Sequence, residues 1–183
     1  MQIKKKSCMN RCNFYGGKKY EGFGHYYSET GNTEKLARAI YDYIDFDKDL
    51  KPVQDVDNPA GYDIIFYGFP VHAHSVPSKA VDLIKQLPEG QNVAFFSTHG
   101  SLRGGQLPKQ AFEHAISLAT KAKILGHFGS RGQVNQKVIE ALLKSPEHKA
   151  WGEEAQSALG HPDEHDLADA KTFAAEIIAK ARR

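Results

Sequence analysis

The sequence predicts a single α/β domain in which helices cover both faces of a parallel sheet. Two apolar runs, at 62–67 and 92–97, have the length and composition of buried strands. Amphipathic helical patterns follow them, and a chain that alternates strands with helices favours a parallel sheet. The length of 183 residues suits one domain with a core of substantial size.

Five strands and four main helices are expected. The strands are predicted at 23–27, 50–56, 62–67, 92–97 and 122–128, and the helices at 33–44, 77–87, 107–121 and 166–181. The first helix has an apolar stripe at Leu36, Ala37, Ile40 and Ile44. Pro77 suits the first turn of the second helix. The strand at 50–56 is weak, because Pro52 has no backbone N–H to pair with a neighbouring strand.

The first predicted strand lacks the apolar run that a central parallel strand usually has. It contains Gly22-Phe23-Gly24-His25-Tyr26, with two glycines and a histidine. We therefore expect an altered, loosely ordered or differently paired strand at this point.

Two segments are expected to lie outside this core fold. Residues 1–19 carry six basic and no acidic side chains, which leaves 18 basic and 22 acidic side chains in residues 20–183. A basic segment can bind nucleic acid or an anionic surface, but the lack of apolar periodicity favours a disordered extension, and we expect no nucleic-acid partner. The segment at 129–160 holds two helical patterns, at 134–143 and 149–159, and Trp151. We expect a lid or a partner contact there. The alternative is a surface segment with no such role.

The composition is that of an ordinary globular protein without a membrane span. Hydrophobic residues make up 40% and charged residues 25% of the chain. No apolar run approaches the ~20 residues needed to cross a bilayer, and the N-terminus lacks the apolar core of a signal peptide. We therefore expect a cytoplasmic protein. Cys8 and Cys12 are expected to be free thiols, since two cysteines are too few for a disulfide scaffold or an iron–sulfur cluster.

The segment just before the helix at 33–44 is rich in hydroxyl groups. Ser28, Thr30 and Thr33 can each donate a hydrogen bond, and Gly31 lets the backbone turn tightly. The free N–H groups and the positive dipole end of the following helix point to the same place, which predicts an anion site. The alternative, a simple helix cap, needs only one hydroxyl.

The spacing also limits which phosphate ligand is expected. The sequence has no G-x-x-x-x-G-K-[ST] and no lysine in the loop, which disfavours a nucleoside triphosphate. A dinucleotide is disfavoured as well, because Tyr27 stands where the G-x-G-x-x-G pattern starting at Gly22 needs its third glycine. This leaves a monophosphate held by neutral donors.

Three motifs, in this order, resemble the flavodoxin family. Ser28-Glu29-Thr30-Gly31-Asn32-Thr33 resembles its [ST]-x-T-G-x-T phosphate loop. Phe69-Pro70-Val71 after the third strand and Thr98-His99-Gly100-Ser101 after the fourth resemble its two flavin-flanking loops. The resemblance covers roughly residues 26 to 128. It implies a doubly wound five-stranded parallel sheet in the order 2-1-3-4-5 and FMN as the cofactor.

The resemblance also implies where FMN would bind, since ligands of such sheets lie beyond the carboxyl ends of the strands. The expected cofactor-binding residues are Ser28, Glu29, Thr30, Gly31, Asn32, Thr33, Pro70, Val71, His72, Thr98, His99, Gly100 and Gly104. His72 and His99 stand where flavodoxins commonly place aromatic residues against the ring, and His74 is evenly balanced between ring contact and surface. Zinc bound by His72 and His74 is an alternative that lacks a third ligand.

An imidazolium beside the reduced ring would stabilise its negative charge. We therefore expect the flavin potential to rise as the pH falls through ~6–7, where an unperturbed histidine gains its proton.

The sequence shows no catalytic constellation of its own. Because a bound flavin carries the chemistry, the function expected first is electron transfer by an FMN-binding protein that serves a partner redox enzyme. One alternative is a small FMN-dependent NAD(P)H reductase of quinones or other conjugated acceptors. Another is a flavin-free interaction module on the same fold.

Overall fold

The computed structural model describes residues 14–15 and 18–183. Most of the predicted N-terminal extension, including Cys8 and Cys12, therefore lies outside the described residues. Within residues 1–19 the structure describes two short strands, β1 (Phe14–Tyr15) and β2 (Lys18–Lys19), which pair in antiparallel fashion.

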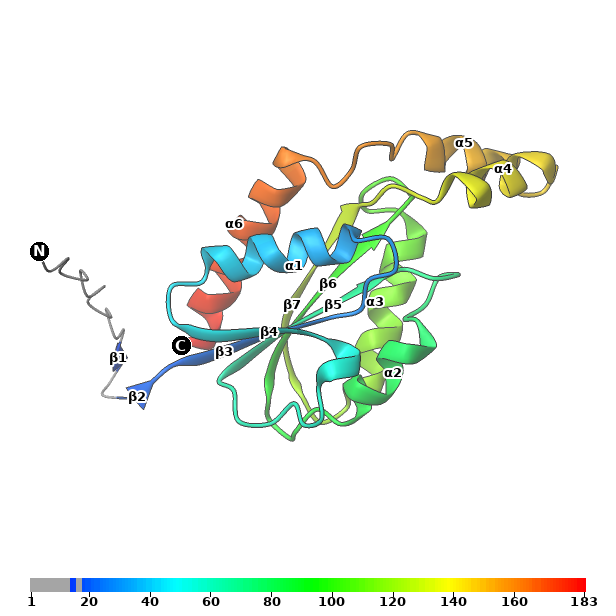
Figure 1. Cartoon of the computed structure of the whole chain (residues 1–183). Helices are drawn as coiled ribbons and strands as arrows, with labels where there is room; N and C mark the ends of the chain where they lie inside the picture. Colours follow the sequence, from blue (N-terminus) through cyan, green and yellow to red (C-terminus); the bar gives the residue numbers. More distant parts are fainter. Residues whose placement is uncertain (1–13, 16–17) are drawn as a thin grey trace, which may run out of the picture.

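The centre of the fold is a five-stranded parallel sheet (Figure 1). Its strands are β3 (Glu21–Tyr26), β4 (Asp47–Pro52), β5 (Ile64–Pro70), β6 (Asn92–His99) and β7 (Lys123–Arg131). They lie in the order β4-β3-β5-β6-β7, and each neighbouring pair is parallel. In chain order this is 2-1-3-4-5, so the predicted α/β fold class and its single domain are confirmed.

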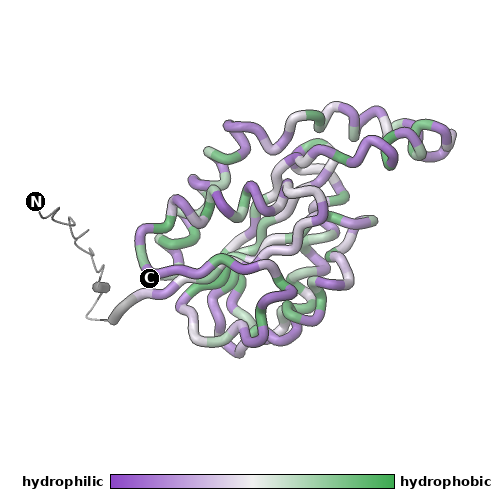
Figure 2. Tube along the Cα trace, viewed as in Figure 1, coloured by the Kyte–Doolittle hydropathy of each residue, from purple (hydrophilic) through white to green (hydrophobic). Residues whose placement is uncertain are grey.

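Helices cover both faces of this sheet, as Figure 1 shows. The two that pack on one face are α1 (Asn32–Tyr43) and α6 (Glu164–Ala181), and the two on the other are α2 (Ser78–Lys85) and α3 (Gln106–Leu118). Each face has its own apolar core. Figure 2 shows that hydrophobic residues follow the inner strands, whereas the edge strand β4 is largely hydrophilic. Among the described helices, none combines the length and the apolar character that crossing a bilayer requires.

β3 is an interior strand of the sheet, and neighbouring side chains fill the space above its glycines. A Cβ at Gly22 would lie 2.6 Å from Cε2 of Phe46, and one at Gly24 would lie 2.7 Å from Cδ1 of Leu50. Phe46 and Leu50 thus make the apolar contacts that larger residues of β3 would otherwise make. The expectation of a differently paired strand is wrong, since β3 pairs with both β4 and β5.

The opposite face of β3 buries Phe23 and His25. Their ring centroids lie 3.7 Å apart in an edge-to-face arrangement. Neither ring nitrogen of His25 has a hydrogen-bond partner among the described residues. Burial, helped by the charge of Lys51, lowers the pKa of His25 to about 3, so the buried ring is neutral.

Two strands differ from their predicted boundaries. β4 runs over Asp47–Pro52 rather than 50–56, because an edge strand tolerates exposed charged residues and Pro52 cannot extend the pairing. A short 3₁₀ turn, Val53–Asp55, follows it. β7 continues to Arg131, since its last residues pair with β6 as far as His99. The segment that connects the sheet to α6 therefore begins at Gly132 and not at residue 129.

This connecting segment forms two short helices, α4 (Gln136–Lys144) and α5 (Lys149–Gln156), close to the predicted helical patterns at 134–143 and 149–159. We call residues 136–156 the α4–α5 arm. It projects from the end of the sheet at which β6 and β7 finish (Figure 1).

Beyond the arm, α6 is held to the loop after β6 by charged groups. Arg103 contacts Asp166 at 2.7 Å and Asp169 at 2.5 Å. Asp166 is buried and also forms a capping box with Asp163. Burial alone would raise the pKa of Asp166, but hydrogen bonds from His161, from the backbone of Asp163 and from Arg103 lower it to about 2.

Candidate functional site

The hydroxyl-rich loop lies between β3 and α1, as predicted. Gly31 has a φ of 85°, a conformation that favours glycine, and it immediately precedes the helix. The Oγ of Ser28 accepts hydrogen bonds from the N–H groups of Gly31 (3.1 Å) and Glu34 (3.4 Å). The first N–H groups of a helix have no acceptor within the helix itself, so those of Asn32 and Thr33 remain available for an anion.

Side chains of the first helical turn tie this loop to the rest of the site. The hydroxyls of Thr33 and Thr98 lie 2.9 Å apart in the interior. The amide of Asn32 donates to the carbonyl oxygen of Gln133 at 2.9 Å. The loop before α1 is thus fixed to the end of β6 and to the start of the connecting segment. Since the Thr33 hydroxyl is paired and buried, Thr30 is the loop hydroxyl that lies exposed.

A cleft of about 410 Å³ opens where these elements meet. The expected residues that line it are Glu29, Thr30, Asn32, Pro70, Val71, His72, Thr98, His99 and Gly100. Its walls therefore come from the loops that follow β3, β5 and β6, at the carboxyl ends of the strands. The other expected residues, Ser28, Gly31, Thr33 and Gly104, do not line this cleft.

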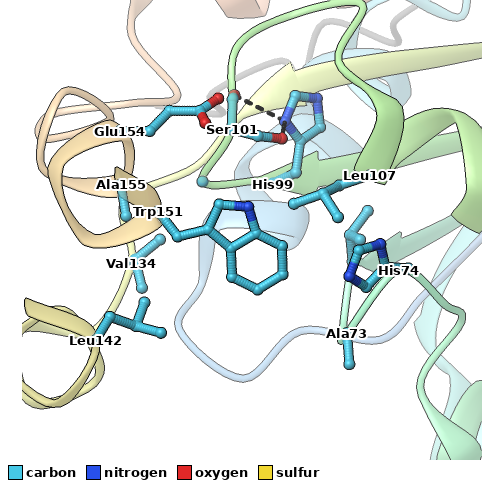
Figure 3. A pocket seen from close by; sticks show the side chains of 12 residues that line it. Ala73, His74, His99, Ser101, Leu107, Val134, Leu142, Trp151, Glu154 and Ala155 are labelled. Carbon is cyan, nitrogen blue, oxygen red and sulfur yellow. Dashed lines mark hydrogen bonds between the residues drawn. The ribbon is translucent and has the colours of Figure 1, made fainter. Parts of the chain in front are cut away.

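The cleft continues into a smaller apolar pocket of about 130 Å³ (Figure 3). The two spaces share lining residues from the loop after β5, from the end of β6 and from the connecting segment: Val71, Ala73, His99, Gly100 and Val134. We call the smaller space the ring pocket, because it lies between the two loops expected to flank a flavin ring. Its outer wall is formed by Leu142, Trp151 and Ala155 of the α4–α5 arm.

The loop after β5 makes a tight turn between the two spaces. His72 and Ser75 exchange backbone hydrogen bonds of 3.0 and 2.8 Å. The two residues between them, Ala73 and His74, have φ values of 43° and 68°, which are strained for residues with a side chain. His74 also contacts Gln110 through Nδ1 at 2.8 Å. Ala73 of this turn lines both spaces.

At the mouth of the cleft, Glu29 lies close to Tyr27 and His72. Its carboxylate accepts a hydrogen bond from the hydroxyl of Tyr27 at 2.6 Å and lies 3.4 Å from Nε2 of His72. His72 is exposed there and lines the larger space only. Among the described residues that line the cleft, none is lysine or arginine.

His99 lies at the back of both spaces and is 5% exposed. Its Nδ1 is 2.9 Å from the carbonyl oxygen of Ser101 and 3.1 Å from its hydroxyl (Figure 3). Burial lowers the pKa of His99 to about 4. The expected imidazolium at pH ~6–7 is therefore wrong for His99, which is neutral at that pH.

The sequence reasoning missed the contribution of the connecting segment to the site. Gly132, Gln133, Val134, Asn135 and Val138 line the larger space, and Trp151 lines the ring pocket. The signal that could have found Trp151 is its uniqueness, since it is the one tryptophan of the sequence. The expectation that this segment acts as a lid or partner contact stays a prediction.

Comparison with known proteins agrees with the geometry. A family model described as a flavodoxin domain matches residues 25–175. The flavodoxin-like domain-containing protein BilS of Clostridioides difficile (strain CD3) is 29% identical over 168 residues, which cover 85% of this chain and 95% of that protein.

Solved structures show the same fold. A flavodoxin from the domain Archaea has a TM-score of 0.58 at 16% identity, covering 89% of this chain and 99% of that chain. Oxidised Flavodoxin 2 from Bacillus cereus has a TM-score of 0.58 at 18% identity, covering 87% and 99%. Because the family model spans most of the sequence, this chain belongs to the flavodoxin domain family.

Proposed function

We propose that the protein carries FMN in this cleft and transfers electrons for a partner redox enzyme. The observation that carries the proposal is the convergence of three loops on one cleft, at the N-terminus of α1 and the carboxyl ends of β5 and β6. Membership of the flavodoxin domain family supports a flavin as the ligand. Ligands of open parallel sheets bind at the switch in strand order, which here lies between β3 and β5, and the position of the cleft at this switch supports the proposal.

The donors of the cleft fit the phosphate of FMN. Thr30, whose side chain is exposed, and Asn32, the first residue of α1, line one end of the larger space, and the helix dipole favours negative charge there. The carboxylate of Glu29 accepts a hydrogen bond from the hydroxyl of Tyr27, which limits its repulsion of an anion. The volume of about 410 Å³ lies within the range of about 300–1,000 Å³ that small-molecule sites occupy.

The opposite end of the cleft fits a flat, largely apolar ring. Leu107, Val134 and Leu142 offer apolar contact, while backbone groups of Gly100 and Ser101 offer hydrogen bonds at one edge. A bound flavin supplies electron transfer in one- or two-electron steps, and the protein binds it, orients it and limits its contact with water.

The phosphate end is tested by comparing FMN with riboflavin, which lacks the phosphate. We expect Thr30→Ala to weaken FMN binding about tenfold or more, because a hydrogen bond to a charged group contributes about 1.5–3 kcal/mol. Riboflavin binding should change little. The matched control is Thr120→Ala, an exposed threonine beyond the end of α3, which should leave both affinities unchanged. Equal losses for FMN and riboflavin in Thr30→Ala would contradict the placement of the phosphate.

The electron-transfer role is tested separately from binding. With FMN bound, the protein alone should consume NAD(P)H slowly and should accept electrons only when a reductase is added. Rapid NAD(P)H consumption without a partner would instead indicate a small reductase of quinones or other conjugated acceptors.

A further inference from the structure

Trp151 is the aromatic side chain that the α4–α5 arm, and not a loop after a strand, contributes to the ring pocket. It lies on α5, is 37% exposed, and its ring centroid is 5.3 Å from that of His74 at an angle of 37°. Figure 3 shows the indole between the apolar side chains of the connecting segment and His74. The arm and the loop after β5 therefore meet at this side chain.

The arm is held in place by contacts with the end of β6 and the loop that follows. A Cβ at Gly100 would lie 2.3 Å from Cγ2 of Val134, so the connecting segment packs directly on the backbone there. The carboxylate of Glu154 accepts a hydrogen bond from the N–H of Leu102 at 2.6 Å. Arg131 donates to the hydroxyl of Ser157 at 2.5 Å. These contacts fix α5, and with it Trp151, relative to His99 and the ring pocket.

The chemistry of the ring pocket matches a flat aromatic ligand. The pocket is lined by the aliphatic side chains of Leu107, Val134, Leu142 and Ala155, and the polar groups of His99 and Ser101 lie at its back. An indole beside such a space offers a large flat surface, and aromatic rings stack in offset or edge-to-face arrangements.

We propose that Trp151 packs against the ring of the bound flavin and that the α4–α5 arm is the wall of the ring site. The inference rests on the proposed function. It assigns the ring contact to a helix inserted after β7, rather than to His72, which does not line the ring pocket. Because Trp151 lines the ring pocket and not the phosphate end, its removal should affect FMN and riboflavin equally.

The test measures flavin emission and affinity in Trp151→Leu. An indole in contact with a flavin quenches the flavin's fluorescence by donating an electron to its excited state, so bound flavin should be nearly dark in the parent. In Trp151→Leu its emission should rise severalfold, and the affinities for FMN and riboflavin should both fall about tenfold. Trp151→Phe keeps an aromatic face but quenches poorly, so it should combine near-parent affinity with bright emission.

The control is Tyr43→Leu, an exposed aromatic at the end of α1 that lies far from the phosphate loop, which should match the parent in both measurements. If the parent binds FMN, and Trp151→Leu binds it as tightly and its bound flavin stays dark, the role of Trp151 is overturned but the proposed function is not. A parent that binds neither flavin overturns the proposed function as well.

Discussion

Acidification should destabilise this fold through two buried histidines, His25 and His99. Burial lowers their pKa values to about 3 and about 4, whereas a histidine in the unfolded chain titrates near 6.5. Below pH 6.5 the unfolded chain binds more protons than the folded one, so the free energy of unfolding falls as the pH drops through 6.5. It continues to fall until the pH approaches the folded pKa values. At pH 5 each histidine should lower the stability by about 2 kcal/mol relative to pH 7.

The assay is urea unfolding of the parent and of His25→Leu at pH 7 and pH 5. Leucine has a similar volume and no ring nitrogens to bury unpaired, so the variant should be at least as stable as the parent at pH 7. Between pH 7 and pH 5 it should lose about 2 kcal/mol less than the parent does, because the other two histidines whose pKa values burial lowers, His99 and His127, are present in both proteins. Asp166 does not contribute over this interval, because its pKa of about 2 when folded and its ordinary value of 3.8 both lie below pH 5.

His165→Gln is the matched control, since His165 is an exposed histidine on α6. It should keep the full pH dependence of the parent. If His25→Leu loses as much stability on acidification as the parent does, the reasoning about the buried ring is refuted.

Two further substitutions test the packing. Gly24→Ala should lower the free energy of unfolding by about 1 kcal/mol, because its Cβ would meet the end of the Leu50 side chain, and adding Leu50→Ala should cost less than the two separate losses combined. Strict additivity in urea unfolding would show that the clash is not the cause. Arg103→Met should lower the stability by about 1–3 kcal/mol, since the buried carboxylate of Asp166 loses one of its donors. An unchanged urea midpoint would show that this ion pair does not stabilise the fold.

Local patterns were sufficient to predict most of the strands and helices and the loop before α1, whereas the order of the strands was implied by the resemblance to the flavodoxin family. The apolar runs at β5 and β6 and the stripe of α1 are properties of short stretches of sequence, and so is the glycine that precedes α1. The expected residues of three loops lie around one cleft, because the carboxyl ends of parallel strands meet at one edge of the sheet.

The features that were missed depend on contacts between distant residues. β3 did not look like a central strand, because Phe46 and Leu50 supply the apolar contacts over its glycines. His99 looked like a titrating histidine, because its burial depends on the extension of β6 and its pairing with β7. The position of Trp151 depends on the docking of α5, in which Leu102 and Glu154 are 52 residues apart.

The flavin content of the purified protein tests the central claim most directly. The protein should carry, or take up on titration, one FMN per chain, identified by the absorbance of the complex and by the mass of the ligand released on denaturation. The bound flavin should be FMN rather than riboflavin when both are offered together, because the phosphate end contributes hydrogen bonds to a charged group. A protein that is isolated without flavin and shows no spectral change on titration with FMN would contradict the account.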